Sequence, residues 1–171
     1  MAIFGYDDAG LSSQDTGLAN NSICCYAVLS EAALVSKLSV WVREGDVAAC
    51  AIVGFIAAAS GDEVGSVTGG TTQEASIARN QAAGYVDLTY ASPVSLSAGN
   101  YWLGYMGSST ATSLRNYYGS SGSRYIHYRG GTYPTIPGTI DFHFAANSVL
   151  RIYATYTVPS TGESYYYRMN Q

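Results

Sequence analysis

Apolar and polar side chains alternate along much of the chain. Within residues 37–43, the leucine and the two valines face one way, while Trp41 and its polar neighbours face the other. A two-residue period is typical of a strand with one buried face. Residues 85–90 and 150–156 alternate in the same way. We therefore expect three strands here, each with one face in a core.

Other segments have the composition of strands without clean alternation. They are residues 23–30, 100–105, 113–118, 124–129 and 139–144. Residues 48–56 are apolar on both faces, which predicts a central strand. The turn at Gly119–Gly122 predicts a hairpin between residues 113–118 and 124–129. Residues 74–83 have room for one or two helical turns.

The spacing of these segments favours an all-β fold. Short strands separated by Gly, Ser, Asn and Pro about every ten residues are typical of sandwiches and barrels. We expect an antiparallel, jelly-roll-like β-sandwich of about nine or ten strands. Residues 1–158 form its single domain and residues 159–171 a C-terminal tail. Tyr165, Tyr166 and Tyr167 make this tail either a frayed terminus or an arm that docks on a neighbouring subunit.

Charge is sparse and carries a small negative excess. Charged residues are 12% of the chain, the net charge is −4, and the eight basic residues are scattered. This pattern argues against a phosphate-binding or anionic membrane-binding surface. No basic and apolar leader is visible at the start, and the apolar run 47–60 is too short to span a bilayer. We expect synthesis in a cytoplasm and no partner among nucleic acids or membranes.

The three cysteines do not form a disulfide framework. Cys24 and Cys25 are adjacent, and Cys50 is the third. Small buried thiols are the simplest interpretation. A bridge from Cys50 to either of the other two stays open if their strands are neighbours.

Acidic side chains offer only scattered candidates for calcium. The candidates are Asp7, Asp8 and Asp62, and solvated loop carboxylates are the simpler explanation of them. Calcium needs six to eight oxygens, and no EF-hand spacing is present. No other cofactor is expected.

Catalytic residues do not form a recognisable set. Asp141 and His143 share a strand face by alternation, but no nucleophile accompanies them. A hydrolase resting on this pair is therefore the last of our hypotheses, and we expect no enzyme.

Aromatic residues are the strongest functional signal. The chain has 16 Tyr, 4 Phe and 2 Trp. Alternation places Tyr90 and Tyr156 in the core and Tyr85 and Tyr153 on the outside. Tyr and Arg provide rigid contact area at interfaces and also stack on sugars. The candidates for an interface or a glycan contact are Trp41, Trp102, Tyr117, Tyr118, Arg124, Tyr125, His127, Tyr128, Arg129, Tyr165, Tyr166 and Tyr167; a tyrosine-rich sheet face without a ligand is the alternative.

Three segments also resemble a known family. Residues 81–104, 33–40 and 150–156 are similar to strands and turns of the choice-of-anchor β-sandwich modules. Such modules occur in bacterial surface proteins and as small virion proteins of tailed phages. The resemblance implies a jelly-roll-like sandwich and supplies no catalytic residues.

These features together favour a virion structural protein. We expect a capsid decoration (cement) protein of a bacteriophage, located in the virion, that contacts other virion proteins and its own copies. A trimer is favoured among the closed oligomers. The alternative is a receptor- or carbohydrate-binding module that contacts a cell-surface glycan, as in a tail fibre or an adhesion domain.

Overall fold

A computed structural model describes most of the chain. It covers residues 1–7, 13–15, 19–43, 49–60, 63–79, 81–108, 115–119, 125–136, 139–140, 145–147 and 149–159. Its strands are β1 (Ala2–Gly5), β2 (Ser13–Asp15), β3 (Asn21–Leu29), β4 (Ala33–Arg43), β5 (Cys50–Ser60), β6 (Glu63–Thr71), β7 (Ala75–Ile77), β8 (Gly84–Leu96), β9 (Gly99–Gly107), β10 (Arg115–Gly119), β11 (Tyr125–Gly130), β12 (Thr139–Ile140), β13 (Ala145–Asn147), β14 (Val149–Leu150) and β15 (Ile152–Thr157).

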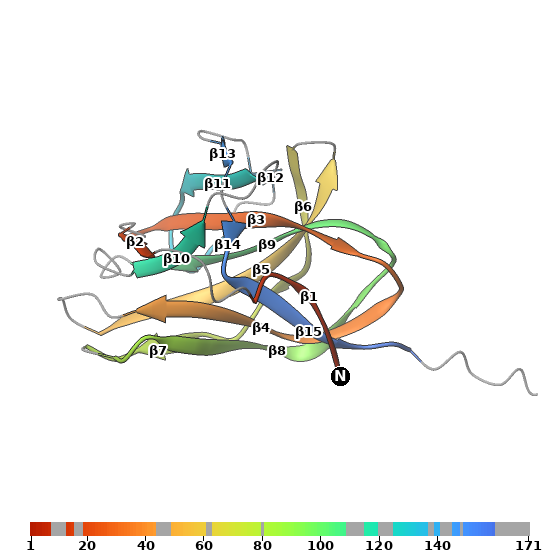
Figure 1. The fold of residues 1–171 in the computed structure, drawn as a ribbon, viewed down its shortest axis with the longest axis horizontal. Helices are drawn as coiled ribbons and strands as arrows, with labels where there is room; N and C mark the ends of the chain where they lie inside the picture. Colours follow the sequence, from red (N-terminus) through yellow and green to blue (C-terminus); the bar gives the residue numbers. More distant parts are fainter. Residues whose placement is uncertain are drawn as a thin grey trace, which may run out of the picture.

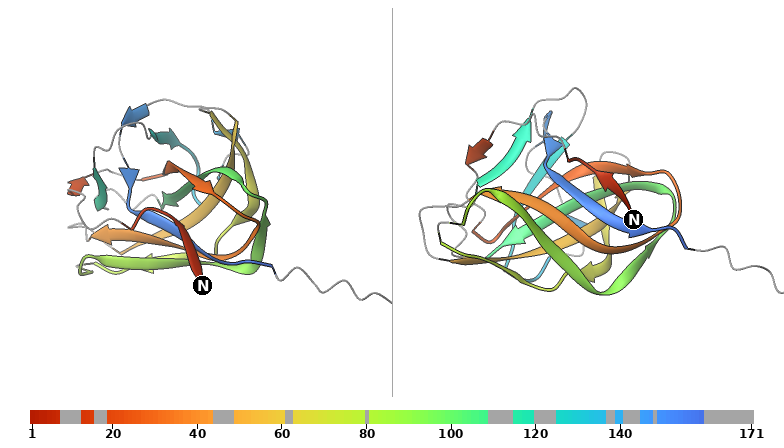
Figure 2. Two further views of the ribbon diagram at one scale, coloured as in Figure 1. Left: turned by 45° about the vertical axis from the view of Figure 1, so that its right-hand side comes forward. Right: turned by 60° about the horizontal axis from the view of Figure 1, so that its bottom comes forward.

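The strands form two sheets that pack face to face, which confirms the predicted all-β sandwich (Figure 1). One sheet has the order β1-β15-β4-β10-β14, with β8 on β4 and β2 on β10. The other has the order β12-β6-β5-β9-β3-β11-β13, with β7 on β5. We call them the seven-stranded and the eight-stranded sheet. Figure 2 shows the two layers from two further sides.

Local pattern predicted the long strands better than the short ones. The described residues form fifteen strands, more than the nine or ten expected. The strands that were not predicted are the short β1, β2, β7 and β13, which have too few residues for a period to show, and the nine-residue β6, whose three glycines interrupt its pattern. A break at Arg151 also splits the predicted strand 150–156 into β14 and β15.

One local prediction is wrong. β10 and β11 do not pair as a hairpin, because β10 joins the seven-stranded sheet and β11 joins the eight-stranded sheet. The one or two helical turns for which residues 74–83 had room are not formed: residues 75–77 are the strand β7, and no residue in the described part of the chain is helical. Residues 75–77 form a strand because they pair with the long strand β5. Three residues alone have too little intrinsic preference to select a strand over a helical turn.

The main core lies between the sheets. Leu38 and Val40 of β4, Ile152 of β15 and Leu88 of β8 enter it from the seven-stranded sheet. The opposing sheet contributes side chains such as Tyr105 of β9. Tyr90 and Tyr156 are buried in this core as predicted. The two-residue period therefore assigned these inward faces correctly.

The eight-stranded sheet is also buried on part of its outer face. Cys24, Phe55, Ala57 and Trp102 form a second apolar cluster there, with Tyr26, Val67 and Ile136 packed around it. β5 therefore has apolar neighbours on both faces and lies between β6 and β9. This confirms the central strand predicted from residues 48–56.

Candidate functional site

The exposed side of the seven-stranded sheet carries aromatic and charged side chains in rows. Trp41 of β4 lies opposite Tyr85 of β8, and Ser39 of β4 lies between Asp87 of β8 and Tyr153 of β15. These residues alternate with those of the main core, so their side chains point away from it, although Ser39 is itself fully buried on the outer face. The predicted outward faces of Trp41, Tyr85 and Tyr153 are confirmed, because all three are only partly buried.

Arg151 is the centre of this surface. Its guanidinium lies 3.8 Å from the Trp41 ring centroid and 5.1 Å from that of Tyr85. Its Nε donates a 3.0 Å hydrogen bond to the Tyr85 hydroxyl. Only 11% of the Arg151 side chain is exposed, so the guanidinium is largely desolvated and the cation–π attraction is stronger than at an open surface.

Tyr85 links Arg151 to the N-terminal segment. Its hydroxyl donates to the carboxylate of Asp7, which also lies 3.8 Å from a terminal nitrogen of Arg151. Burial and the bond to Asp7 raise the pKa of Tyr85 to about 12, although Arg151 acts in the opposite direction. The phenol therefore keeps its proton at neutral pH and remains a donor. We call Asp7, Trp41, Tyr85, Arg151 and Tyr153 the aromatic cluster.

The rings of the aromatic cluster do not form a flat platform. Trp41 and Tyr85 meet at 90° with centroids 4.8 Å apart, and Tyr85 and Tyr153 meet at 69° and 5.1 Å. Sugar stacking needs an accessible ring face, whereas one face of Trp41 is already occupied by Arg151. The cluster is thus satisfied largely by its own members and ties β4, β8 and β15 to the segment after β1.

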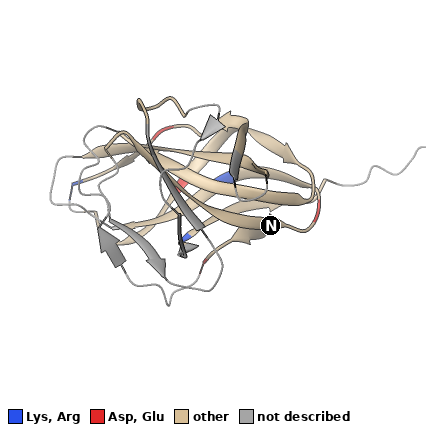
Figure 3. Ribbon diagram, turned by 90° about the horizontal axis from the view of Figure 1, so that it is seen from above, with Lys and Arg blue, Asp and Glu red and all other residues tan. Residues whose placement is uncertain are grey.

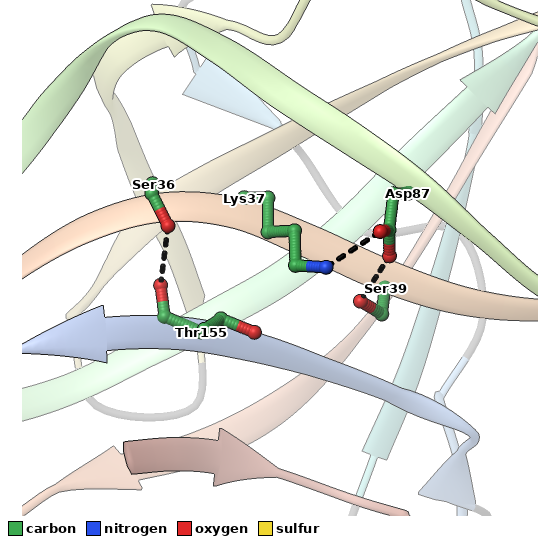
Figure 4. Close-up of polar contacts among 5 residues, drawn as sticks. All are labelled: Ser36, Lys37, Ser39, Asp87 and Thr155. Atoms are coloured by element: carbon green, nitrogen blue, oxygen red, sulfur yellow. Dashed lines mark hydrogen bonds and ion pairs between the residues drawn. The ribbon is translucent and has the colours of Figure 1, made fainter. Parts of the chain in front are cut away.

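A smaller polar group lies beside the aromatic cluster. Lys37 Nζ is 2.5 Å from Asp87 Oδ2, and the buried Ser39 hydroxyl donates a 2.6 Å bond to Asp87 Oδ1 (Figure 4). Ser36 bonds the Thr155 carbonyl at 3.4 Å in the same view. Ser39 is wholly buried and donates to a carboxylate held by a cation. This arrangement fastens β4 to β8, and it does not present Ser39 as a nucleophile.

Trp102 is not available as a contact residue. Its side chain has no exposed surface and lies in the second apolar cluster, edge-on to Tyr26 at 5.4 Å. The expectation that Trp102 contacts a partner or a glycan is therefore wrong. The reason is tertiary: the outer face of β9 is covered by neighbouring segments, which a strand pattern does not reveal.

Large apolar side chains are exposed at one end of the sandwich. Met1 is 99% exposed, Ile3 50% and Val158 51%. Ile3 pairs with Thr155, and Val158 follows Thr157 at the end of β15. We call Met1, Ile3 and Val158 the end patch. Sequence reasoning missed it because each of its residues is an isolated apolar residue, and its only signal was the apolar start of the chain.

Val28 is a fourth exposed apolar residue near this end. It is 57% exposed and pairs with Asn100 beside the end of β3. Val28 belongs to the eight-stranded sheet and is not part of the end patch.

Many of the predicted contact residues cannot be placed on a site. Arg124 and the three tyrosines at 165–167 lie outside the described residues. Tyr117, Tyr118, Tyr125, His127, Tyr128 and Arg129 are placed by their backbone only, in β10 and β11. Because these two strands belong to different sheets, the six residues do not form the single hairpin surface that we expected.

Only one of the candidate calcium ligands and catalytic residues lies within the described part of the chain. Asp7 is engaged by Tyr85 and Arg151, while Asp8, Asp62, Asp141 and His143 lie outside the described residues. The described part of the chain holds no group of three His, Cys, Asp or Glu side chains that could bind a metal.

None of the three cysteines is in a disulfide, and Cys24 and Cys25 are buried while Cys50 is partly buried. β9 separates β3 from β5, so the strands that carry these cysteines are not neighbours. This explains why neither bridge to Cys50 forms. Burial raises the pKa of Cys25 to about 12, and its thiol donates to the Leu150 carbonyl.

Within the described residues, no helix is long and apolar enough to cross a membrane. Comparisons with protein-family models, with curated proteins and with solved structures found no match.

Proposed function

We infer that this chain is a structural protein of a virus particle, which decorates a bacteriophage capsid and stabilises it through contacts between subunits. The observation that carries this proposal is the end patch. Exposed large apolar residues on described segments gather where the chain starts and where β15 leaves the sandwich. Apolar surface in this position favours contact with another protein over contact with water.

The surface chemistry supports the same role. Charged residues are few on the described strands and do not form a field of one sign (Figure 3). Such a surface loses little hydration energy when it is covered, because fewer ions must be desolvated. Contacts smaller than a standard interface of about 1,600 Å² can still hold many copies on one particle, because weak contacts add through multivalency. A non-enzymatic cement protein needs only these properties.

The glycan-binding alternative loses its best residues. Trp102 is buried, and one face of Trp41 is covered by Arg151. The phage setting and the decoration role come from the resemblance to choice-of-anchor modules, and the end patch supports the part of the proposal that concerns contacts.

Immunogold labelling tests the proposal directly. An antibody raised against the purified chain would be applied to virus particles released by cells whose genome carries this sequence. Gold over the capsid is the expected result. Gold confined to tail tips would support receptor binding instead, and particles without label would refute a virion role.

A further inference from the structure

We propose that the end patch of one copy binds the C-terminal tail of a neighbouring copy, through Tyr165, Tyr166 and Tyr167. This inference rests on the proposed assembly function and names the contact that would perform it. It commits to one occupant of the patch, a second copy's residues 160–171.

The position of the last described residues supports this occupant. Val158 belongs to the end patch, and the tail continues from Pro159 directly beside it. Thr157 pairs with Leu34, close to the turn between β3 and β4, so β15 carries the chain off this end of the sandwich. Figure 1 shows β15 and the N-terminus meeting at the same end.

The length of the tail is sufficient for a contact between copies. Twelve residues, 160–171, follow the described chain. An extended chain spans at most about 3.5 Å per residue, so the tail can reach about 40 Å, and its first tyrosine about 20 Å. A neighbour that packs at this end of the sandwich therefore lies within its range.

The size of the patch fits a short peptide better than a second sandwich. Three exposed side chains offer on the order of a few hundred Å² of apolar surface. A stable interface between two folded subunits buries about 1,600 Å². Three consecutive tyrosines match the smaller area, and each has a flat apolar ring and a hydroxyl that stays hydrated.

Chemical character also matches on the two sides. The strand β1, which carries Ile3 of the end patch, contains no charged residue. The three tyrosines are uncharged and are preceded by a Ser- and Gly-containing segment, 160–164, that can follow the surface of a neighbour. Apolar contact between tyrosine rings and Ile3 is thus the expected source of affinity.

Light scattering and sedimentation of the full-length protein test the proposal. One variant carries Ile3→Lys, and a second carries Tyr165→Ser, Tyr166→Ser and Tyr167→Ser together. Each is expected to weaken self-association about tenfold or more, as the loss of one well-buried apolar side chain would. The control variant is Ser76→Lys on β7, which is exposed and pairs with the start of β5, at the opposite end of that strand from Ser60. It should associate like the unaltered protein.

A mixing experiment separates contact between copies from contact within one copy. The Ile3→Lys variant keeps an intact tail, and the tyrosine variant keeps an intact patch. Mixing them should therefore form mixed oligomers at concentrations at which neither variant associates alone. Failure to form mixed oligomers, or equal association of all variants, would overturn the proposal.

Capsid labelling distinguishes this failure from failure of the proposed function. If the tail contact is wrong but the protein decorates particles, gold still marks the capsid, and the variants self-associate like the unaltered protein. Ile3 is half-exposed, so its substitution should leave the thermal unfolding midpoint of the sandwich unchanged, which excludes misfolding as the cause.

Discussion

Asp87 shows how one carboxylate joins two strands. Burial would raise its pKa, but hydrogen bonds from Lys37 and Ser39 and the charge of Lys37 outweigh burial and lower it. The ion pair is partly exposed, with 33% of the Lys37 side chain and 50% of the Asp87 side chain accessible. Solvent screening therefore limits its contribution to about 0–1 kcal/mol.

The lowered pKa predicts a loss of stability in acid. A carboxyl group whose pKa is depressed by folding stabilises the protein above its unfolded value, near 4, and this contribution disappears as the pH falls through the lower folded value. Asp87→Asn keeps an oxygen that can accept from Ser39 but removes the charge. We expect it to lower the free energy of unfolding at pH 7 by up to about 1 kcal/mol and to cost less at pH 2.5.

Urea unfolding at the two pH values measures this difference. Lys37→Met provides the control background. Without the Lys37 charge, Asp87→Asn should have a smaller effect on the free energy of unfolding, and that effect should depend less on pH. An equal cost of Asp87→Asn at pH 7 and pH 2.5 would show that the ion pair does not contribute.

Tyr105 illustrates a cost that the core tolerates. Its side chain is wholly buried in the described structure, and its hydroxyl has no hydrogen-bond partner there. Burial raises its pKa well above the ordinary value, with the nearby Cys50 and Cys25 acting in the same direction. An unpaired buried hydroxyl costs about 1–3 kcal/mol, which the burial of a large ring offsets.

At the scale of elements, glycines set how closely strands and side chains approach. Gly54 of β5 faces Leu38 and Leu88, and a Cβ there would lie 2.9 Å from a methyl carbon of each. Gly104 of β9 is tighter: a Cβ would lie 2.4 Å from Phe55 Cζ, 2.6 Å from Cys24 Cβ and 2.7 Å from the Ile23 carbonyl oxygen. Gly104 thus allows the Phe55 ring to lie on β9 within the second apolar cluster.

Gly104→Ala is expected to destabilise the sandwich strongly. Overpacking costs typically 1–3 kcal/mol, and the backbone of β3 leaves little room for relaxation, so we expect about 3 kcal/mol. Gly99→Ala on the same strand is the matched control, because its Cβ would meet only Tyr101 at 3.6 Å, an ordinary contact. Denaturant midpoints measure both changes, and similar midpoints for the two variants would contradict the packing described for β9.

At the scale of the whole molecule, the two sheets depend on one core. β4, β8 and β15 contribute to it from one side and β3, β5 and β9 from the other. Loss of either sheet would expose the apolar face of the other. The sandwich should therefore unfold as one cooperative unit.

The two tryptophans can report on this cooperativity. Trp41 lies on the outer side of the seven-stranded sheet, and Trp102 is buried on the outer side of the eight-stranded sheet. In single-tryptophan variants, Trp41→Phe and Trp102→Phe, urea transitions followed by fluorescence should coincide with those followed by circular dichroism. Separate transitions in either variant would show that the sheets unfold independently.

The alternation of apolar and polar residues along the chain determined much of the fold. The alternation in residues 37–43 and 85–90 assigned the buried and outer faces of β4 and β8, and the two-sided apolar run predicted β5 as a central strand. These predictions succeed because the face of a side chain depends on its immediate neighbours along a strand.

Tertiary structure decided which segments meet. The assignment of β10 and β11 to different sheets, the burial of Trp102 and the stacking of Arg151 on Trp41 all join residues distant in the chain. A turn of glycine and serine permits a hairpin without requiring one. Alternation places Arg151 on the outer face but does not predict which side chains it contacts. Strand pairing and side-chain contact depend on the packing of the complete sandwich, so the sequence determined the faces of its strands and only the fold determined their neighbours.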